Sequence, residues 1–209
     1  MTMGRTLTRQ EAKAVTRRRL LDAAIRILDE EGDVALTTTS VTRLAGIAQS
    51  SFYVHFADMD ELLHTLIDEL ALERRRLTRL ARQEARDAPG NQDRLRATFR
   101  VPLEDLIAHG RVFRLLQRSR FDNSPLGEWS RSLLAGSRDA LIEDLVAAGI
   151  PGATPTDRRR VAMVADGIIA LTETFALGHL DGRYPDIEEI VDMLITFSHG
   201  YFPLLKGSR

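Results

Sequence analysis

Three consecutive polar residues, Gln49-Ser50-Ser51, stand at the expected start of a helix, and Tyr53 and His55 follow closely. The amide of Gln49 offers an acceptor and donors, which suits the edge of an adenine in the major groove. The hydroxyls of Ser50 and Ser51, at the positive end of a helix dipole, suit phosphate oxygens and base edges. These residue types predict a binding surface for nucleic acid.

The sequence has none of the patterns that are typical of a helical enzyme. It contains no cysteine, which excludes thiol catalysis, disulfides and cysteine-based zinc sites. It has no Gly-Lys-Ser/Thr phosphate loop, no Gly-x-Ser-x-Gly elbow and no His-Glu-x-x-His. His64 and Asp68 are four residues apart and could share a metal, but a polar surface pair on a helix is the favoured interpretation. We predict no enzyme activity, no catalytic residue, no metal site and no cofactor.

The composition is that of a globular protein. Of 209 residues, 44% are hydrophobic and 28% are charged, which argues against long disorder. Glycine, proline and aromatic residues are too few for a typical β-sandwich or barrel. No apolar run approaches the ~18 residues of a membrane span, and no secretory core follows Met1. We therefore expect a cytoplasmic protein without a membrane partner.

The charge is unevenly distributed. The net charge is −1, yet the first 19 residues hold six basic side chains and one acidic side chain, Glu11. A basic start on a nearly neutral chain suggests a local anionic partner. A solvated tail explains this feature equally well.

Helical periodicity runs through nearly the whole chain and predicts an all-α protein with about nine helices. Apolar residues from Leu20 to Leu28 recur at intervals of three and four, on one face of a helix that begins near Glu11 and ends at Gly32. Further helices are expected at about 92–109, 111–119, 124–149, 156–181 and 186–204, with Gly, Pro, Asn and Asp between them.

The segment around Gly46 predicts a helix-turn-helix. Threonine hydroxyls in residues 36–40 suit a helix start, and this helix ends at Gly46. Only Gly46-Ile47-Ala48 separates it from the next helix, and Ile47 is expected to fill the shared core. Asp58 or Asp60 is expected to cap the fourth helix.

The stretch LAGIAQSSFYVHF at residues 44–56, with DELL at 60–63, resembles the recognition-helix signature of TetR-family transcriptional repressors. The resemblance covers about residues 14–67. It implies a three-helix DNA-binding domain at 1–57 and a helical effector-binding and dimerisation domain at 58–209. It also implies a homodimer that blocks transcription from a palindromic double-stranded operator, with recognition helices about 34–36 Å apart.

The resemblance assigns roles to individual residues. Thr37 caps the second helix, and Thr38 and Thr39 face the groove. Gln49, Ser50 and Ser51 read bases and phosphates, while Tyr53 and His55 bind backbone phosphates. A buried, hydrogen-bonded tyrosine and a capping or packed histidine are the alternatives for the last two. Phe52 and Phe56 are expected in the core.

Two positions depart from the family pattern. The family often has Arg where Thr39 stands, and Lys where Asp58 and Met59 stand. Both changes weaken attraction to phosphates, and we expect Arg5 and Arg9 in the basic tail to compensate. Deleting residues 1–9 is then expected to lower affinity and flatten its salt dependence.

The family's effector chamber implies a set of ligand-binding residues with apolar walls and a few polar anchors. They are Phe99, Leu103, Leu106, His109, Phe113, Arg114, Gln117, Arg118, Trp129 and Glu173. The similarity extends to repressors of unsaturated-fatty-acid synthesis, which sense acyl-thioesters, and Arg114 or Arg118 would then meet an anionic head group. An aliphatic ligand of another type remains the alternative, and ligand could strengthen or weaken DNA binding.

The last two expected helices carry wide apolar stripes. The stripes suit either a four-helix interface between subunits or the chain's own core, and the family favours the interface. The predicted interface residues are Val161, Val164, Ile168, Phe175, Ile190, Leu194 and Phe202. In the expected mechanism, ligand binding tilts the helix that begins near Asp60. This tilt spreads the two DNA-binding domains of the dimer, so that they no longer match adjacent major grooves. A ligand-independent DNA-binding protein is the remaining alternative.

Overall fold

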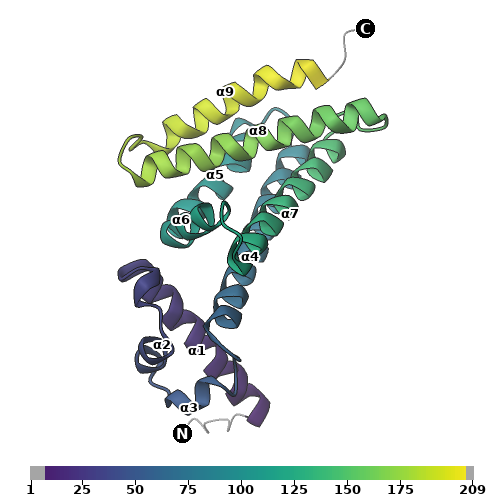
Figure 1. Ribbon diagram of the computed structural model, residues 1–209. Helices are drawn as coiled ribbons and strands as arrows, with labels where there is room; N and C mark the ends of the chain where they lie inside the picture. The colour runs from purple at the N-terminus through teal and green to yellow at the C-terminus, as the bar shows by residue number, and fades with distance from the viewer. Residues whose placement is uncertain (1–7, 206–209) are drawn as a thin grey trace, which may run out of the picture. The chain divides into compact units, whose positions relative to one another are not determined.

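The computed structural model describes residues 8–205, with side chains described up to residue 200, and this range is helical without a strand (Figure 1). Arg5 and the side chain of Phe202 lie outside the described residues. The expectation of an all-α protein with about nine helices is confirmed. The elements are α1 (Arg9–Glu30), the 3-10 helix η1 (Asp33–Ala35), α2 (Thr38–Ala45), α3 (Gln49–Phe52), α4 (Met59–Asp87), α5 (Gln92–Ala108), α6 (Gly110–Ser119), α7 (Pro125–Ala147), α8 (Pro155–Leu180) and α9 (Ile187–Leu205).

Helix ends follow from short polar side chains that accept from free backbone N–H groups. Thr8 caps α1 in a capping box with Glu11. Thr154 caps α8 in the same way, with Pro155 at its first position. Of the two aspartates that could cap α4, the structure uses Asp58, whose Oδ1 accepts from the N–H of Glu61 at 2.8 Å.

The chain forms two compact units, the first ending at Leu70 and the second beginning at Ala71. The first unit contains the helix-turn-helix together with the start of α4, because Leu62, Leu66 and Ile67 are buried there. The sequence places its domain boundary earlier, between residues 57 and 58. Burial of these three side chains is a tertiary effect that the turn at residues 57–58 does not reveal.

The core of the first unit is built on the predicted stripe of α1. Leu20, Ala24, Ile27 and Leu28 are almost completely buried, as their spacing indicates. Burying a leucine or isoleucine side chain stabilises a fold by about 1.5–3 kcal/mol. This core positions α2 and α3, which carry the polar residues predicted to contact DNA; their exposed side is called the reading surface below.

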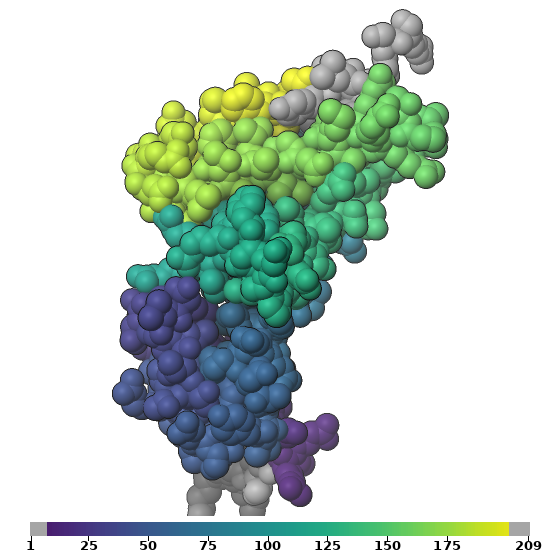
Figure 2. All heavy atoms as spheres, viewed as in Figure 1, coloured from purple at the N-terminus to yellow at the C-terminus, as the bar shows by residue number. Residues whose placement is uncertain are grey.

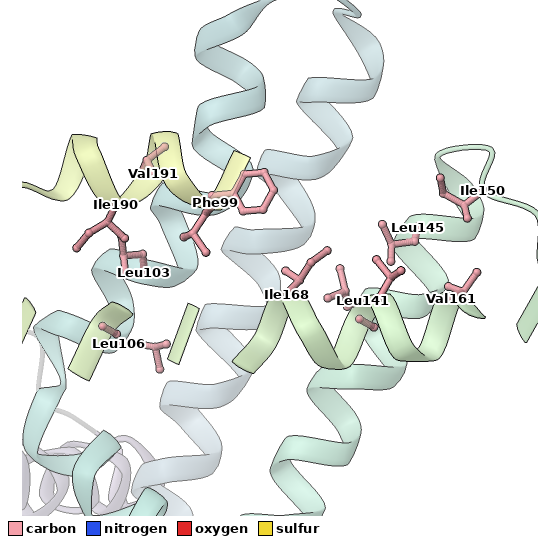
Figure 3. Packing of buried hydrophobic residues seen from close by; sticks show 14 of the residues in the cluster. Phe99, Leu103, Leu106, Leu141, Leu145, Ile150, Val161, Ile168, Ile190 and Val191 are labelled. Carbon is pink, nitrogen blue, oxygen red and sulfur yellow. The ribbon is translucent and has the colours of Figure 1, made fainter. Parts of the chain in front are cut away.

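The core of the second unit lies between α5, α7, α8 and α9 (Figure 3). Its most buried members include Leu103 on α5, Val161 and Ala165 on α8, and Val191 on α9. None of the described residues of α4 belongs to this cluster. The second unit therefore holds α4 by other means than its main apolar core.

Helix α8 is long and apolar enough to pass a length-and-composition test for a membrane span. This corrects the expectation that no segment comes near one. Core helices of soluble proteins share this length and apolar composition. Val161, Ala165 and Ala176 of α8 are completely buried in the protein.

Candidate nucleic-acid interface

The turn between α2 and α3 is shaped by Gly46, which has φ 64° and ψ 43° in the left-handed region. The N–H of Gly46 donates to Arg43 O and that of Ile47 to Thr42 O, which closes α2. A Cβ at position 46 would lie 3.1 Å from a guanidinium nitrogen of Arg19 on α1. Both backbone conformation and space therefore favour glycine here.

Aromatic side chains anchor α3 in the first unit. Phe52 and Phe56 are buried, as predicted, and their ring centroids lie 5.8 Å apart. The ring of Tyr53 meets that of Phe52 edge to face at 5.5 Å. Because α3 is only one turn long, this packing rather than helix length holds its polar residues in place.

The polar residues predicted to read DNA are mostly exposed on α2 and α3. Thr37 accepts from the N–H of Ser40 at 3.1 Å, which confirms its role as the cap of α2. Exposed members are Thr37, Thr39, Gln49, Ser50 and Tyr53; Thr38, Ser51 and His55 are half-buried. The structure thus brings together a polar surface above a buried apolar layer.

Tyr53 does not adopt the buried alternative, since 60% of its surface is exposed. Its neighbour Val54 is equally open, at 63%. The sequence analysis assigned no role to Val54. Its position between Tyr53 and His55 is the feature of the sequence that could have indicated exposure on the same surface. Its methyl groups suit contact with a thymine methyl.

His55 is half-buried, and its Nδ1 is buried without a hydrogen-bond partner. Burial lowers the pKa of His55 below its usual value, and the nearby cations Lys13 and Arg17 lower that pKa further. The imidazole is therefore neutral near pH 7. A phosphate placed beside it would favour the protonated, donating form.

Arg17 connects α1 to the start of α4 within the first unit. Its guanidinium lies 4.8 Å from the centre of the Phe56 ring, donates to Thr65 Oγ1 at 3.2 Å and pairs with Glu69 at 3.5 Å. Neighbouring Arg18 also pairs with Glu69, at 3.2 Å. Two of the six basic residues near the N-terminus are thus paired with Glu69 of the same chain.

Other cations remain exposed on the first unit. Arg9 is exposed at the first residue of α1. Thr8 caps that helix, so deleting residues 1–9 would remove the cap as well as the charge, and Arg9→Gln is the cleaner test. Arg43, which the sequence analysis missed, is exposed on α2 one turn after Thr39. This four-residue spacing places a cation on the same face of α2 as Thr39.

The apolar residues predicted to line an effector chamber pack in the core of the second unit. Phe99, Leu103, Leu106 and Phe113 are all buried in its core cluster, and Figure 3 labels the first three of them. This is the packing alternative that applies to any single apolar residue.

The polar residues predicted to anchor a ligand have diverse surroundings. Arg114 pairs with Asp181 at 2.7 Å, which lowers the pKa of that carboxyl, and Arg118 is exposed. The half-buried Glu173 accepts hydrogen bonds from both terminal nitrogens of Arg120, at 3.0 and 3.1 Å. His109, Gln117 and Trp129 are half-buried, and the Nδ1 of His109 has no hydrogen-bond partner.

Five of the seven residues predicted at a subunit interface are buried in the chain's own core, which is the alternative that their apolar stripes left open. They are Val161, Val164, Ile168, Ile190 and Leu194. Phe175 is half-buried and stacks on Phe197 with ring centroids 6.3 Å apart. The large apolar side chains that α8 and α9 leave exposed are Met163, Met193 and Phe197.

Within residues 8–200, no group of three histidine, aspartate or glutamate side chains is arranged to hold a metal ion. His64 is half-buried and Asp68 is exposed on α4.

Comparison with known proteins agrees with this geometry. Residues 20–66 match the family model for bacterial regulatory proteins of the tetR family. A TetR-like transcriptional regulator from Rhodococcus sp. RHA1 has a similar fold, with a TM-score of 0.64 and 21% identity, over 92% of this chain and 96% of that one. The fatty acid degradation regulator FadR from Bacillus halodurans gives 0.66 and 16% identity, over 88% and 94%.

A transcriptional regulator from Aquifex aeolicus VF5 adds a TM-score of 0.65 with 13% identity, over 86% of this chain and 95% of that one. These regulators share with this chain an all-α fold, and in this chain the helix-turn-helix lies near the start. The chain therefore resembles TetR-family transcriptional regulators in fold over most of its length, and in sequence over residues 20–66.

Proposed function

We propose that the chain is a cytoplasmic repressor that binds a palindromic operator as a homodimer and is released or tuned by a small effector. The observation that carries the DNA-binding part is the exposed polar surface of α2 and α3 above buried Phe52 and Phe56. Gln49 and Ser50 read bases in the major groove, and Tyr53 and His55 contact phosphates. Arg43 and Arg9 add attraction to the backbone.

The test begins with selecting duplexes from a random pool with the full-length protein. Affinity for the selected duplex is then measured by fluorescence anisotropy for Gln49→Ala and for Gln83→Ala, an exposed glutamine on α4 outside the reading surface. Loss of a bidentate base contact weakens each half-site by about 1–3 kcal/mol. The proposal requires weak and less selective binding by Gln49→Ala alone, and equal binding by both variants contradicts it.

The subunit interface is proposed on the exposed side of α8 and α9. These helices lie side by side and form one continuous surface of the second unit (Figures 1 and 2). Met163 is 67% exposed, and Met193 and Phe197 are also open. Exposed apolar side chains on two adjacent helices suit a four-helix contact with a second copy.

Met163→Glu places a charge in this surface, and Val146→Glu places one on an exposed apolar position of α7. We expect Met163→Glu to shift the mass measured by analytical ultracentrifugation from dimer toward monomer, and to weaken operator binding with it. Val146→Glu is expected to remain a dimer. A wild-type monomer at micromolar concentration, or a fully dimeric Met163→Glu, contradicts the assignment of this interface.

The effector is proposed to bind the second unit and to act through α4, which continues from one unit into the next. A coupling of about 1–3 kcal/mol changes operator affinity 5- to 150-fold. FadR from Bacillus halodurans regulates fatty acid degradation, and acyl compounds are therefore the first ligands to test. The ligand-independent alternative predicts that no ligand of the second unit changes operator affinity.

A further inference from the structure

Within the second unit, the inward face of α4 carries small residues and arginines in place of large aliphatic residues. Ala71, Thr78 and Ala81 are buried on this face. Half-buried arginines at positions 74, 75, 82 and 86 alternate with them at helical spacing. This composition is unusual for an inward helix face, since arginine is rarely buried without a partner.

Three of these four arginines have carboxylate partners. Arg74 pairs with Asp105 of α5 at 3.4 Å. Arg82 and Arg86 share the buried Asp144 of α7, at 2.8 and 4.0 Å. Charge is thus largely balanced at both ends of this face.

Arg75 differs, because it has no carboxylate partner among the described residues. One terminal nitrogen donates to the backbone oxygen of Leu133 at 3.3 Å, while its Nε is buried without any partner. One turn away, Thr78 is 94% buried, and its Oγ1 also lacks a partner. A half-buried cation and a buried hydroxyl therefore stand three residues apart on one helix face with donors to spare.

The opposite helix leaves room for this guanidinium. On α7, a Cβ at Gly136 would lie 2.6 Å from a terminal nitrogen of Arg75. The glycine therefore allows Arg75 to occupy the space between α4 and α7. A side chain at position 136 would displace the guanidinium without removing its charge.

We propose that Arg75 and Thr78 form an oxyanion site, which recognises the carboxylate or phosphate group of the effector. This proposal names the chemical group of the effector that is recognised, and it rests on the effector-responsive function proposed above. An oxyanion supplies the two things that are missing, a negative charge for Arg75 and acceptors for its Nε–H and for the Thr78 hydroxyl. Buried charges are normally paired in this way, and buried donors normally have acceptors.

The experiment uses isothermal titration of the full-length protein with three probes: octanoate, its neutral analogue octanol, and inorganic phosphate. The variants are Arg75→Gln, Thr78→Val and Gly136→Ala. The matched control is Arg79→Gln, because Arg79 lies on the same helix and pairs with the exposed Glu143. A charge-assisted hydrogen bond gives roughly a 10- to 100-fold effect on affinity.

We expect wild type and Arg79→Gln to bind octanoate, phosphate or both, and the three site variants to bind them at least tenfold more weakly. Binding of octanoate alone identifies a carboxylate on an apolar chain, whereas binding of phosphate identifies a phosphate group. Octanol is expected to be bound equally by all five proteins. The proposal is overturned if neither oxyanion binds wild type, or if Arg75→Gln binds octanoate as tightly as wild type does.

Thermal unfolding without ligand separates a binding role from a structural one. Thr78→Val removes a buried hydroxyl that has no partner, so we expect its unfolding midpoint to rise by about 2–4 °C. A lower midpoint for Thr78→Val would show that the hydroxyl serves the fold, against the proposal. Operator affinity measured with and without octanoate tests the regulatory function separately. If octanoate binds at Arg75 but leaves operator affinity unchanged, the oxyanion site is supported and control of DNA binding by octanoate is contradicted.

Discussion

Removing the hydroxyl of Tyr53 tests the reading surface with the smallest change in the protein. Tyr53 is 60% exposed, and its ring rests edge to face on Phe52, 5.5 Å away. Its hydroxyl makes no hydrogen bond to another described residue. Tyr53→Phe keeps the ring and its contact with Phe52, so we expect the free energy of unfolding to change by less than about 0.5 kcal/mol.

The effect on operator binding is expected to be large by comparison. A hydrogen bond from an uncharged hydroxyl to a charged phosphate contributes about 1.5 kcal/mol. A dimer loses two such bonds, or about 3 kcal/mol, which corresponds to roughly 100-fold in affinity. The salt dependence of binding is expected to stay the same, because the hydroxyl carries no charge and releases no counterion.

Fluorescence anisotropy with the selected operator, at several salt concentrations, measures both quantities. Tyr184→Phe is the matched control, since Tyr184 is also exposed but belongs to the second unit. Equal operator affinity for Tyr53→Phe and Tyr184→Phe would refute the assignment of Tyr53 to a phosphate. A strong fall in the stability of Tyr53→Phe would refute the argument that its hydroxyl is free in the unbound protein.

Three further predictions concern the first unit. Gly46→Ala is expected to lower the free energy of unfolding in urea by about 1–2 kcal/mol, because residue 46 has positive φ; an unchanged value contradicts this. Arg17→Met is expected to cost about 1–2 kcal/mol in the same assay, and Arg18→Met at most about 0.5 kcal/mol, since only Arg17 also contacts a ring and a hydroxyl. Equal losses for the two arginine variants would count against the Arg17 contacts. His55 has a lowered pKa, so its contribution is fully present above its ordinary value of about 6.5 and is lost as the pH falls through the lower folded value. Urea midpoints are therefore expected to fall more steeply below pH 6.5 for wild type than for His55→Gln, and parallel curves would contradict the shifted pKa.

Local signals in the sequence predicted the elements of the reading surface well. Thr37 and Gly46 act on their own backbone, so their residue types alone indicate where α2 begins and ends. The apolar stripe of α1 and the aromatic pair Phe52 and Phe56 indicated the core, because helical periodicity follows burial. The exposed face then remained for polar residues such as Gln49.

Contacts between distant residues could not be predicted in this way. The stripe on α8 shows that one face is buried but not what covers it, and Val161 and Ile168 turned out to pack within their own unit. The partner of Arg17 depends on how α1 meets α4, and that of Arg74 on how α4 meets α5. The unpaired state of Arg75 emerges only when the surroundings of every arginine on α4 are known.

The sequence of the DNA that the full-length protein selects from a random pool tests the central claim most directly. If a dimer presents two α2–α3 surfaces to adjacent major grooves, the selected DNA contains two inverted half-sites whose centres lie about one helical turn or a multiple of it apart. Ultracentrifugation of the complex then gives at least two chains per duplex. Failure to enrich any sequence, or a single asymmetric site bound by one chain, would contradict the account.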